Sequence, residues 1–446
     1  MRNAISRGFL AFAAPVATIA VFTAATLVTP ALIQAQTFSV IHSFNGLDGA
    51  NPWAGLARDK SGNLYGTTFA GGRGNCMTAY GQTGCGTVFQ LSKAGAGWAL
   101  NPLYSFAGGN DGAGPQLGSL TVAANGTIFG TTVVGGGGSC SSYDLSGCGT
   151  VFHLTVPPTI CKTAFCPWRE SVIYRFQNNG DGAYPHGGPI FDNAGNLYGT
   201  AGDYPSYGDI YQLAPSGSSW VFSVAYAFQG NDGQIPEGQL IFDSNGNIDG
   251  TTWAGGADSG GTVFQLTHSG SGWTQSHVYS FTGGTDGRNP TAGVVLDPLG
   301  NLYGATIYGG ENGSGAAFEL SPNSWNVTTS YDFSGTCSGT SAPPGVAGEL
   351  AIDGAGNLYG TTTCGGMYGY GTVFRLAPTQ NGWAYTDLHD FSDQNGDGAY
   401  PFSNVVLDPD TGNLYGTSYA GGVTNSRCDQ AQWAGQCGVV WQITPQ

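Results

Sequence analysis

The sequence predicts an all-β fold, a seven-bladed β-propeller made of four-stranded antiparallel blades. Three observations predict it: the phrase Asp-x-x-Gly-Asn-Leu-Tyr-Gly-Thr-Thr recurs along nearly the whole chain, each copy carries four strand patterns, and the last copy lacks a strand that the first residues supply. A phrase repeated about every 50 to 70 residues is typical of stacked identical units. Its central tyrosine, or the residue replacing it, occupies Tyr65, Phe129, Tyr198, Asp249, Tyr303, Tyr359 and Tyr415.

Each copy predicts four strands in a fixed order. A short apolar segment comes first, as over 238–243, and an Asp-x-x-Gly-Asn turn follows, as over 192–196. Its aspartate can accept hydrogen bonds within the turn and its glycine can adopt a positive φ, which is the chemistry of a hairpin. The second strand is Asn-Leu-Tyr-Gly-Thr-Thr, the third is Gly-Thr-Val-Phe-Gln-Leu, and the fourth runs from a tryptophan to Tyr-Ser-Phe. Short strands of this composition predict an antiparallel meander.

The two ends of the repeat region predict that the blades close into a ring. The seventh copy stops after its third strand, over 438–443, while residues 37–44 carry the fourth-strand pattern before any first strand. Pairing these segments completes a seventh blade and leaves no open inner edge. An open β-solenoid or a paired sandwich is the alternative, but neither explains the complementary ends.

Residues 1–35 have the pattern of a signal peptide. Arg2 and Arg7 precede an apolar stretch, and the small residue Ala35 follows it. We therefore expect residues 1–35 to be removed and residues 36–446 to form one propeller domain that is secreted to the periplasm or the medium. An uncleaved membrane anchor is the alternative, which Pro15 and Pro30 disfavour.

The composition argues against two classes of partner. The formal net charge is −16, and loss of Arg2 and Arg7 would make it two units more negative. An acidic protein of this kind is not expected to bind nucleic acid or an anionic membrane. Only 9% of residues are charged and 77 are glycine, which suits a turn-rich, exported β protein that we expect to be monomeric.

Ten cysteines in an exported chain predict disulfides. Spacing does not fix the connectivity, but it favours four local bridges and leaves Cys337 to pair with Cys364. A zinc cluster would need Cys-x-x-Cys pairs or nearby histidines, which the sequence lacks. The four local pairs are Cys76–Cys85, Cys140–Cys148, Cys161–Cys166 and Cys428–Cys437.

The meander also predicts which loops share an end of the ring. The crossings between blades and the loops between second and third strands should lie together, and we call this end the crossing face. The Asp-x-x-Gly-Asn turns should lie at the opposite end. The long variable loops fall on the crossing face, where binding residues are expected to gather. Cys337, Cys364 and the pairs Cys76–Cys85, Cys140–Cys148 and Cys428–Cys437 lie there as well.

An Asp-Gly-x-x-Pro motif in the crossings supplies candidate metal ligands. The simpler interpretation is that each aspartate caps a turn, because calcium normally takes several oxygen ligands and each motif offers one carboxylate. No cofactor is expected, and calcium is the cation these residues could take. The six aspartates are Asp48, Asp111, Asp181, Asp232, Asp286 and Asp397.

Aromatic residues in the same loops are candidate ligand-binding residues. Flat rings beside polar side chains suit sugars, which have apolar faces and hydroxyl edges, although packing between blades would also explain them. His186, which follows Pro185, is the one candidate for a catalytic base, and no hydrolase, metalloprotease or phosphate-loop motif is present. The aromatic candidates are Trp53, Phe69, Tyr184, Trp253, Tyr308, Tyr400 and Tyr419.

The phrases Gly-Asn-Leu-Tyr-Gly-Thr-Thr (62–68 and 356–362) and Gly-Thr-Val-Phe (86–89, 261–264 and 371–374) resemble the gloeo/verruco, or GloVer, tandem repeat. The resemblance spans about residues 43–443. It implies an exported bacterial protein with a propeller-like repeat, and it implies no particular activity or catalytic residue.

The sequence is compatible with three functions. We expect a secreted, non-catalytic propeller that binds a glycan or a protein through the crossing face. One alternative is an extracellular lyase, hydrolase or lactonase that uses carboxylates and a cation. The other is a structural protein of the cell surface, which the internal repetition would suit.

Overall fold

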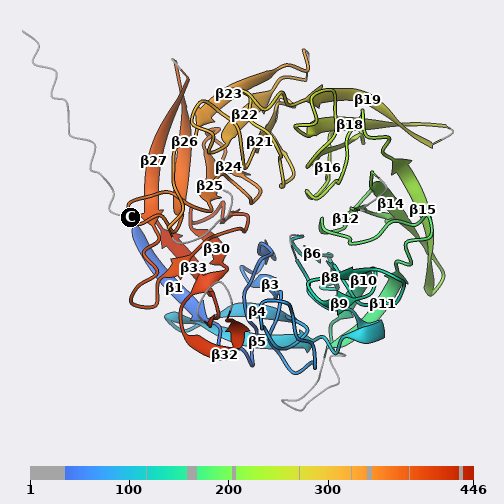
Figure 1. Ribbon diagram of the computed structural model, residues 1–446, viewed down its shortest axis with the longest axis vertical. Helices are drawn as coiled ribbons and strands as arrows, with labels where there is room; N and C mark the ends of the chain where they lie inside the picture. Colours follow the sequence, from blue (N-terminus) through green and yellow to red (C-terminus); the bar gives the residue numbers. More distant parts are fainter. Residues whose placement is uncertain are drawn as a thin grey trace, which may run out of the picture. The chain divides into compact units, whose positions relative to one another are not determined.

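The computed structural model describes residues 36–446, except 117, 158–167, 203–206, 271, 323, 339–343, 381, 431–434 and 446. Gln36–Gln446 form one compact unit. Within the described residues, seven four-stranded antiparallel sheets surround a common axis (Figure 1), which confirms the predicted all-β propeller. The predicted signal peptide lies outside the described residues. No helix among the described residues is long and apolar enough to cross a membrane.

The blades follow one another along the chain. Blade one contains β2 (Ala57–Arg58), β3 (Leu64–Thr68), β4 (Thr87–Ala94) and β5 (Gly97–Ser105), and blade two contains β6 (Thr121–Val122), β7 (Ile128–Thr132), β10 (Thr150–Thr155) and β11 (Arg169–Arg175). Blade three contains β12 (Ile190–Phe191), β13 (Leu197–Ala201), β14 (Asp209–Ser216) and β15 (Ser219–Ala227), and blade four contains β16 (Ile241–Phe242), β17 (Ile248–Thr252), β18 (Thr262–Ser269) and β19 (Gly272–Ser280).

Blade five contains β20 (Val295–Leu296), β21 (Leu302–Ala305), β22 (Ala316–Leu320) and β23 (Val327–Asp332), and blade six contains β24 (Ala351–Ile352), β25 (Leu358–Thr362), β26 (Thr372–Thr379) and β27 (Gly382–Asp390). Blade seven contains β29 (Val406–Leu407), β30 (Leu414–Ser418), β33 (Val439–Thr444) and β1 (Thr37–Ser43). The loops add β8 (Ser141–Ser142), β9 (Leu145–Ser146), β28 (Gly398–Ala399), β31 (Ala420–Gly421), β32 (Thr424–Asp429) and the short 3-10 helix η1 (Gly109–Asp111).

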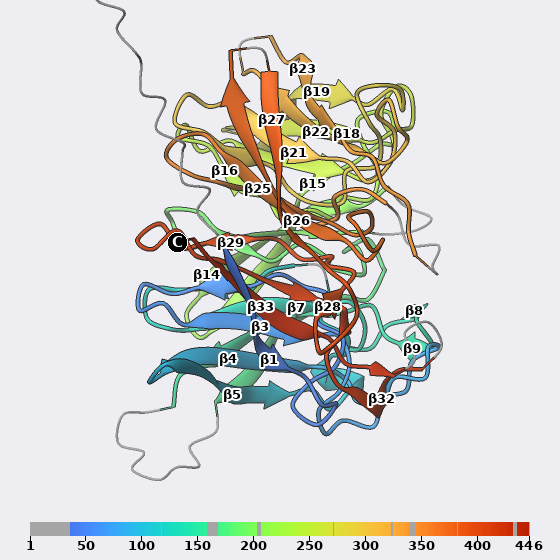
Figure 2. The same cartoon turned by 90° about the vertical axis from the view of Figure 1, so that its left-hand side faces the viewer.

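The ring closes as the two ends of the repeat predict. β1 pairs antiparallel with β33, in a register that runs from Thr37 opposite Thr444 to Ser43 opposite Val439. Figures 1 and 2 show the two strands side by side, one from each end of the described chain. β1 is therefore the outer strand of blade seven, and it leaves no unpaired inner edge in that blade.

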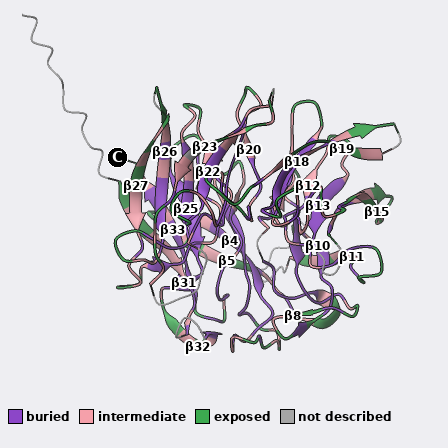
Figure 3. Cartoon of the chain, turned by 45° about the horizontal axis from the view of Figure 1, so that its top comes forward, coloured by how far each residue is buried: buried purple, intermediate pink, exposed green. Residues whose placement is uncertain are grey.

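Burial is greatest in the middle of each blade. The first strand, for example β2, is half-buried and the second strand, for example β3, is buried along its whole length. The outermost strand, for example β5, consists mainly of exposed and half-buried residues, and Figure 3 shows exposed residues at the rim of the ring. The inner sheets pack so closely that a Cβ at Gly66 would lie 2.6 Å from the ring of Phe89 on the next strand. The repeated glycine of Leu-Tyr-Gly-Thr-Thr thus makes room for the repeated phenylalanine of the third strand.

The first strands are shorter than predicted. The apolar pattern over 238–243 predicts a strand of that length, but β16 is only Ile241–Phe242. The preceding residues pack instead against the neighbouring blade, since a Cβ at Gly238 would lie 2.5 Å from the backbone nitrogen of Gly293. This segment leaves the ladder because it lies close to the next blade's backbone.

Four of the five predicted disulfides are present, and the fifth, Cys161–Cys166, lies outside the described residues. No cysteine of the described chain is free. Four disulfides are typical of a protein that folds in an oxidising compartment rather than in the cytosol. The four bridges are Cys76–Cys85, Cys140–Cys148, Cys337–Cys364 and Cys428–Cys437.

Candidate functional site at the axial mouth

The crossings into six of the seven blades are built in the same way. In blades one to five and seven, a crossing proline packs on the glycine that precedes the third strand of the previous blade. Pro185, for example, has its Cδ 2.5 Å from the Cβ position of Gly149. Gly149 has a φ of 97°, which is strained for any residue with a Cβ, and the proline ring occupies the space that a Cβ would need. The residue after each proline then begins the segment that leads into the innermost strand.

These segments meet at the axis. Asn404 of blade seven donates its amide Nδ2 to Ser119 Oγ of blade two at 3.1 Å, and its Oδ1 accepts from the backbone N–H of Leu56 in blade one at 3.0 Å. Since one cavity is lined by residues of blades two, four, five, six and seven, it lies on the axis. We call it the axial cavity; it is lined by Ser119, Glu237, Gly238, Gln239, Thr291, Ala292, Gly293, Ala347, Gly348, Glu349, Phe402 and Asn404.

The axial cavity is narrow and holds two carboxyl groups, those of Glu237 and Glu349. Its volume of about 20 Å³ is the size that holds a single water molecule. Burial raises the pKa of the Glu349 carboxyl to about 8, because the surroundings offer it no compensating charge. No lysine or arginine of the described chain lines this cavity.

His186 lies beside Glu237, which lines this cavity. Its Nδ1 is 3.4 Å from Glu237 Oε1, without the alignment of a hydrogen bond. Both side chains are mostly buried. The pair is contributed by consecutive blades, each residue directly following a crossing proline.

Aromatic rings complete the same region. The ring of Trp53 lies 5.3 Å from Phe402, 5.2 Å from Tyr419 and 5.9 Å from Phe69, measured between ring centroids. Trp53 and Phe402 are half-buried, whereas Phe69 and Tyr419 are buried behind them. Two rings are thus partly accessible on a support of buried ones.

Tyr143 contacts both the aromatic rings and the polar side chains of this region. It lies at the tip of the β8–β9 hairpin, where Tyr143 and Asp144 have φ values of 53° and 62°. Positive φ at both central residues is a type I′ turn, which favours asparagine and glycine rather than tyrosine. The Tyr143 hydroxyl accepts a hydrogen bond from Gln116 Nε2 at 3.2 Å, and its ring is 6.5 Å from that of Trp53.

The hairpin that carries Tyr143 is fixed from three sides. The Tyr184 hydroxyl exchanges hydrogen bonds of 3.1 Å with the backbone of Ser141. The backbone N–H of Ala79, in the neighbouring blade's loop, donates to the Tyr143 carbonyl at 3.1 Å. The Cys140–Cys148 bridge spans the hairpin's base. Figure 2 shows β8 and β9 at the same end of the ring as β32. We call the group Trp53, Gln116, Tyr143, His186, Glu237 and Phe402 the axial mouth.

The predicted aromatic residues divide into three groups. Trp53, Phe69 and Tyr419 come together, but Phe69 and Tyr419 are only 1% and 3% exposed. Tyr184 and the buried Tyr400 hold loops in place. The Tyr184 hydroxyl donates a hydrogen bond to the Ser141 carbonyl, and the Tyr400 hydroxyl donates one to the Ser338 carbonyl. Trp253 and Tyr308 belong to the loops of blades four and five, and the guanidinium of Arg288 lies 5.9 Å from the Tyr308 ring.

The predicted aspartates are each held within one blade. Asp111 accepts from the Tyr104 hydroxyl at 2.8 Å and from the backbone N–H of Ala107 at 2.6 Å. Asp181, Asp232 and Asp286 accept in the same way from Tyr174, Tyr226 and Tyr279. Asp48 and Asp397 pair with His42 and His389, each at 3.2 Å. This geometry is that of a turn cap.

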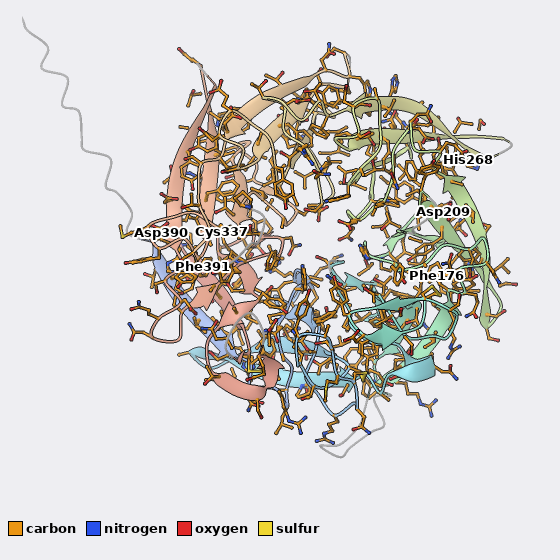
Figure 4. All side chains as sticks on the ribbon, in the orientation of Figure 1. Phe176, Asp209, His268, Cys337, Asp390 and Phe391 are labelled. Atoms are coloured by element: carbon orange, nitrogen blue, oxygen red, sulfur yellow. A yellow bond between two sulfur atoms is a disulfide. The ribbon has the colours of Figure 1, made fainter. Side chains whose placement is uncertain are left out.

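The described residues contain no group of three or more histidine, cysteine or acidic side chains that could hold a metal ion. A cation at the aspartates stays a prediction. Among the other histidines, His268 lies on β18 near the outer edge of blade four (Figure 4), far from the axial mouth.

Sequence reasoning missed most of the axial mouth. Gln116, Glu237 and Phe402 occupy the position after the crossing proline, where the repeat varies while its flanks stay constant, and that contrast was the available signal. Glu349 and Tyr143 gave none. The loop of Tyr143 is framed by Cys140 and Cys148, as the corresponding loops of blades one and seven are framed by Cys76–Cys85 and Cys428–Cys437, but this shared frame does not single out the tyrosine.

Comparison with known proteins identifies the repeat. Residues 138–349 and 276–446 match the family model of the Gloeobacter/Verrucomicrobia repeat. The propeller is similar to a putative 6-phosphogluconolactonase from Bacteroides fragilis, at 14% identity and a TM-score of 0.49 over 84% of this chain and 98% of that one. It is similar to the periplasmic gluconolactonase of Pseudomonas aeruginosa, at 15% identity and a TM-score of 0.48 over 83% and 94%. No curated protein sequence matches this chain significantly. The chain belongs to the Gloeobacter/Verrucomicrobia repeat family.

Proposed function

We propose that this protein is an exported, non-catalytic propeller that binds a glycan at the axial mouth. One observation carries the proposal: the mouth places the half-buried rings of Trp53 and Phe402 beside the polar groups of Gln116 and Glu237. A sugar offers an apolar ring face to aromatic side chains and hydroxyl groups to amides and carboxylates. The disulfides support export, since they persist outside the cytosol.

A glycan suits this position better than a folded protein partner. The half-buried aromatic rings of the axial mouth are those of Trp53, Tyr143 and Phe402, beside a cavity of about 20 Å³, whereas a stable protein interface covers roughly 800 Å² on each partner. The end of a saccharide chain could contact Trp53, Phe402 and Gln116 together. If the experiment below showed that the axial mouth is not needed for binding, a protein ligand on the wider crossing face would be favoured instead.

The test is binding of the mature protein to a glycan array, followed by calorimetry on any saccharide retained. Trp53→Leu combined with Phe402→Leu keeps apolar volume but removes the flat rings, so affinity should fall at least about tenfold. The matched control is Tyr368→Ala, which removes a 48% exposed ring from the blade-six loop of the same face. Unchanged affinity in the double variant, with an unchanged melting temperature, would reject the axial mouth as the binding site.

A second candidate function is hydrolysis, because His186 lies 3.4 Å from Glu237. A carboxylate beside one imidazole nitrogen can orient the ring and make the other nitrogen a better base. Such a protein would be an extracellular lactonase, hydrolase or lyase. Turnover of a lactone or polysaccharide by the unmodified protein, lost in His186→Asn, would favour this function. Loss of turnover when a chelator is added to the unmodified protein would indicate a cation in the reaction.

A further inference from the structure

We propose that the ligand carries a primary amino group, as a hexosamine without its acetyl group does, and that this ammonium enters the axial cavity beside Glu237 and Glu349. The inference rests on the proposed glycan binding at the axial mouth and specifies the chemical class of the glycan. It makes the site selective for a cationic saccharide over neutral and anionic ones.

The charge of the cavity is the first argument. Glu237 and Glu349 both line it, and the described residues place no lysine or arginine on its wall. No hydrogen bond or ion pair of the described chain involves the Glu349 side chain, and His186 is the only basic group in contact with Glu237. Glu349 and Glu237 are both half-buried, and a carboxyl in such a cavity without a partner either stays protonated or binds a cation. Anionic sugars would be repelled from this wall.

The size of the cavity selects the cation. A volume of about 20 Å³ admits a group the size of water, such as an ammonium, and excludes a sugar ring. The ring would stay outside, against Trp53 and Phe402. A calcium ion needs six to eight oxygen ligands, whereas the cavity contributes two carboxyl groups, and no metal-binding group of three acidic or histidine residues occurs in the described chain.

An independent observation comes from Gln116. This side chain is only 4% exposed, and its Nε2 is used by the Tyr143 hydroxyl at 3.2 Å. Its Oε1 accepts no hydrogen bond from any described group. A buried acceptor left unpaired is unfavourable, so a ligand that supplies an N–H or O–H donor would be favoured here. Gln116 belongs to the axial mouth and does not line the axial cavity, so this donor would come from the part of the saccharide that stays outside the cavity.

The experiment compares three saccharides of equal length with the mature protein by calorimetry: an oligomer of glucosamine, its N-acetylated counterpart and an oligomer of glucose. We expect the glucosamine oligomer to bind at least about tenfold more tightly, since a hydrogen bond between charged groups is worth about 1.5–3 kcal/mol. Glu237→Gln and Glu349→Gln should each reduce this preference. The matched control is Glu311→Gln, an exposed carboxylate in the blade-five loop, which removes the same charge and should keep the preference.

The outcomes separate this inference from the function it rests on. Equal binding of the three oligomers overturns the amino-group inference and leaves glycan binding intact. Binding of none overturns both. Loss of the preference in Glu311→Gln as well would assign it to the overall negative charge, against the inference. Displacement of the glucosamine oligomer by millimolar calcium alone, at constant ionic strength, would assign the cavity to a metal ion instead.

Discussion

Phe38 stacks on His389 with their ring centroids 3.6 Å apart and their planes 2° from parallel. Phe38 lies on β1, the strand that closes blade seven, and His389 lies on β27 of blade six. The closing strand therefore does more than pair with β33, because it also packs against the blade that precedes it. The Nε2 of the same histidine contacts Asp397 at 3.2 Å, so the stacked ring is fixed on its other side.

The first prediction concerns this closure. Phe38→Ala removes a half-buried ring that also contacts Phe391 at 5.8 Å, so the free energy of unfolding should fall by about 2 kcal/mol. Urea denaturation of the mature protein measures it. Ser39→Ala, an exposed change on the same strand, serves as the control and should be neutral. An unchanged unfolding midpoint for Phe38→Ala would mean that the closing strand does not limit stability.

The second prediction tests the aspartates of the crossings. Asp286 accepts hydrogen bonds from the Tyr279 hydroxyl at 3.0 Å and from the backbone N–H of Thr282 at 2.8 Å. Asp286→Ala should lower the free energy of unfolding by about 1–3 kcal/mol, while Asp258→Ala, an exposed change in the loop of the same blade, should have little effect.

A chelator distinguishes the two interpretations of these aspartates. If they are turn caps, a chelator leaves the melting temperature of the unmodified protein unchanged. A fall on chelation that calcium restores would establish the cation interpretation, and Asp286→Ala should then weaken the response to calcium.

The third prediction concerns Asp249, which replaces the repeated tyrosine in blade four. The carboxyl is 1% exposed and accepts from Gln265 Nε2 at 3.0 Å. Burial raises its pKa from 3.8 to about 7. Between about pH 4 and pH 7 the folded protein therefore keeps this proton, whereas the unfolded chain releases it. The contribution of Asp249 to the free energy of unfolding is therefore most favourable below about pH 4, falls as the pH rises toward 7 and is least favourable above 7.

Asp249→Asn removes this ionisation while retaining an acceptor for Gln265. It should raise the free energy of unfolding at pH 8, by at most roughly 4 kcal/mol, and the gain should vanish near pH 4. Thermal unfolding across that pH range measures it, with the exposed Asp258→Asn as control. A gain that did not depend on pH would show that Asp249 is not the titrating group.

Parts of this arrangement could be predicted from the sequence and parts could not, for identifiable reasons. The closure of β1 on β33 was readable because the two ends carry complementary halves of one repeated pattern. The turn-capping aspartates were readable because their partners lie within about eight residues along the chain. The meeting of Glu237 and Glu349 at the axis could not be predicted, because the two residues come from different blades and line one cavity only once the ring has closed. The role of Tyr143 could not be predicted, because its ring meets those of Trp53 and Phe69, which belong to another blade, only in the folded ring.

The last prediction separates backbone strain from side-chain contact at that hairpin. Asp144 is exposed and has a φ of 62°, so Asp144→Gly removes an unfavourable conformation and should stabilise the protein by about 0.5–1 kcal/mol. Tyr143→Gly relieves a similar strain at φ 53° but removes a ring that lies 5.3 Å from Phe69. We expect it to destabilise the protein by about 1–2 kcal/mol, because the lost aromatic contacts outweigh the relief. Denaturant unfolding of both variants gives the comparison. Since both changes introduce glycine into one turn, their difference reports the Tyr143 side chain. If Tyr143→Gly were as stabilising as Asp144→Gly, the ring would contribute nothing to folding. The strained tyrosine would then have to be explained by ligand binding alone.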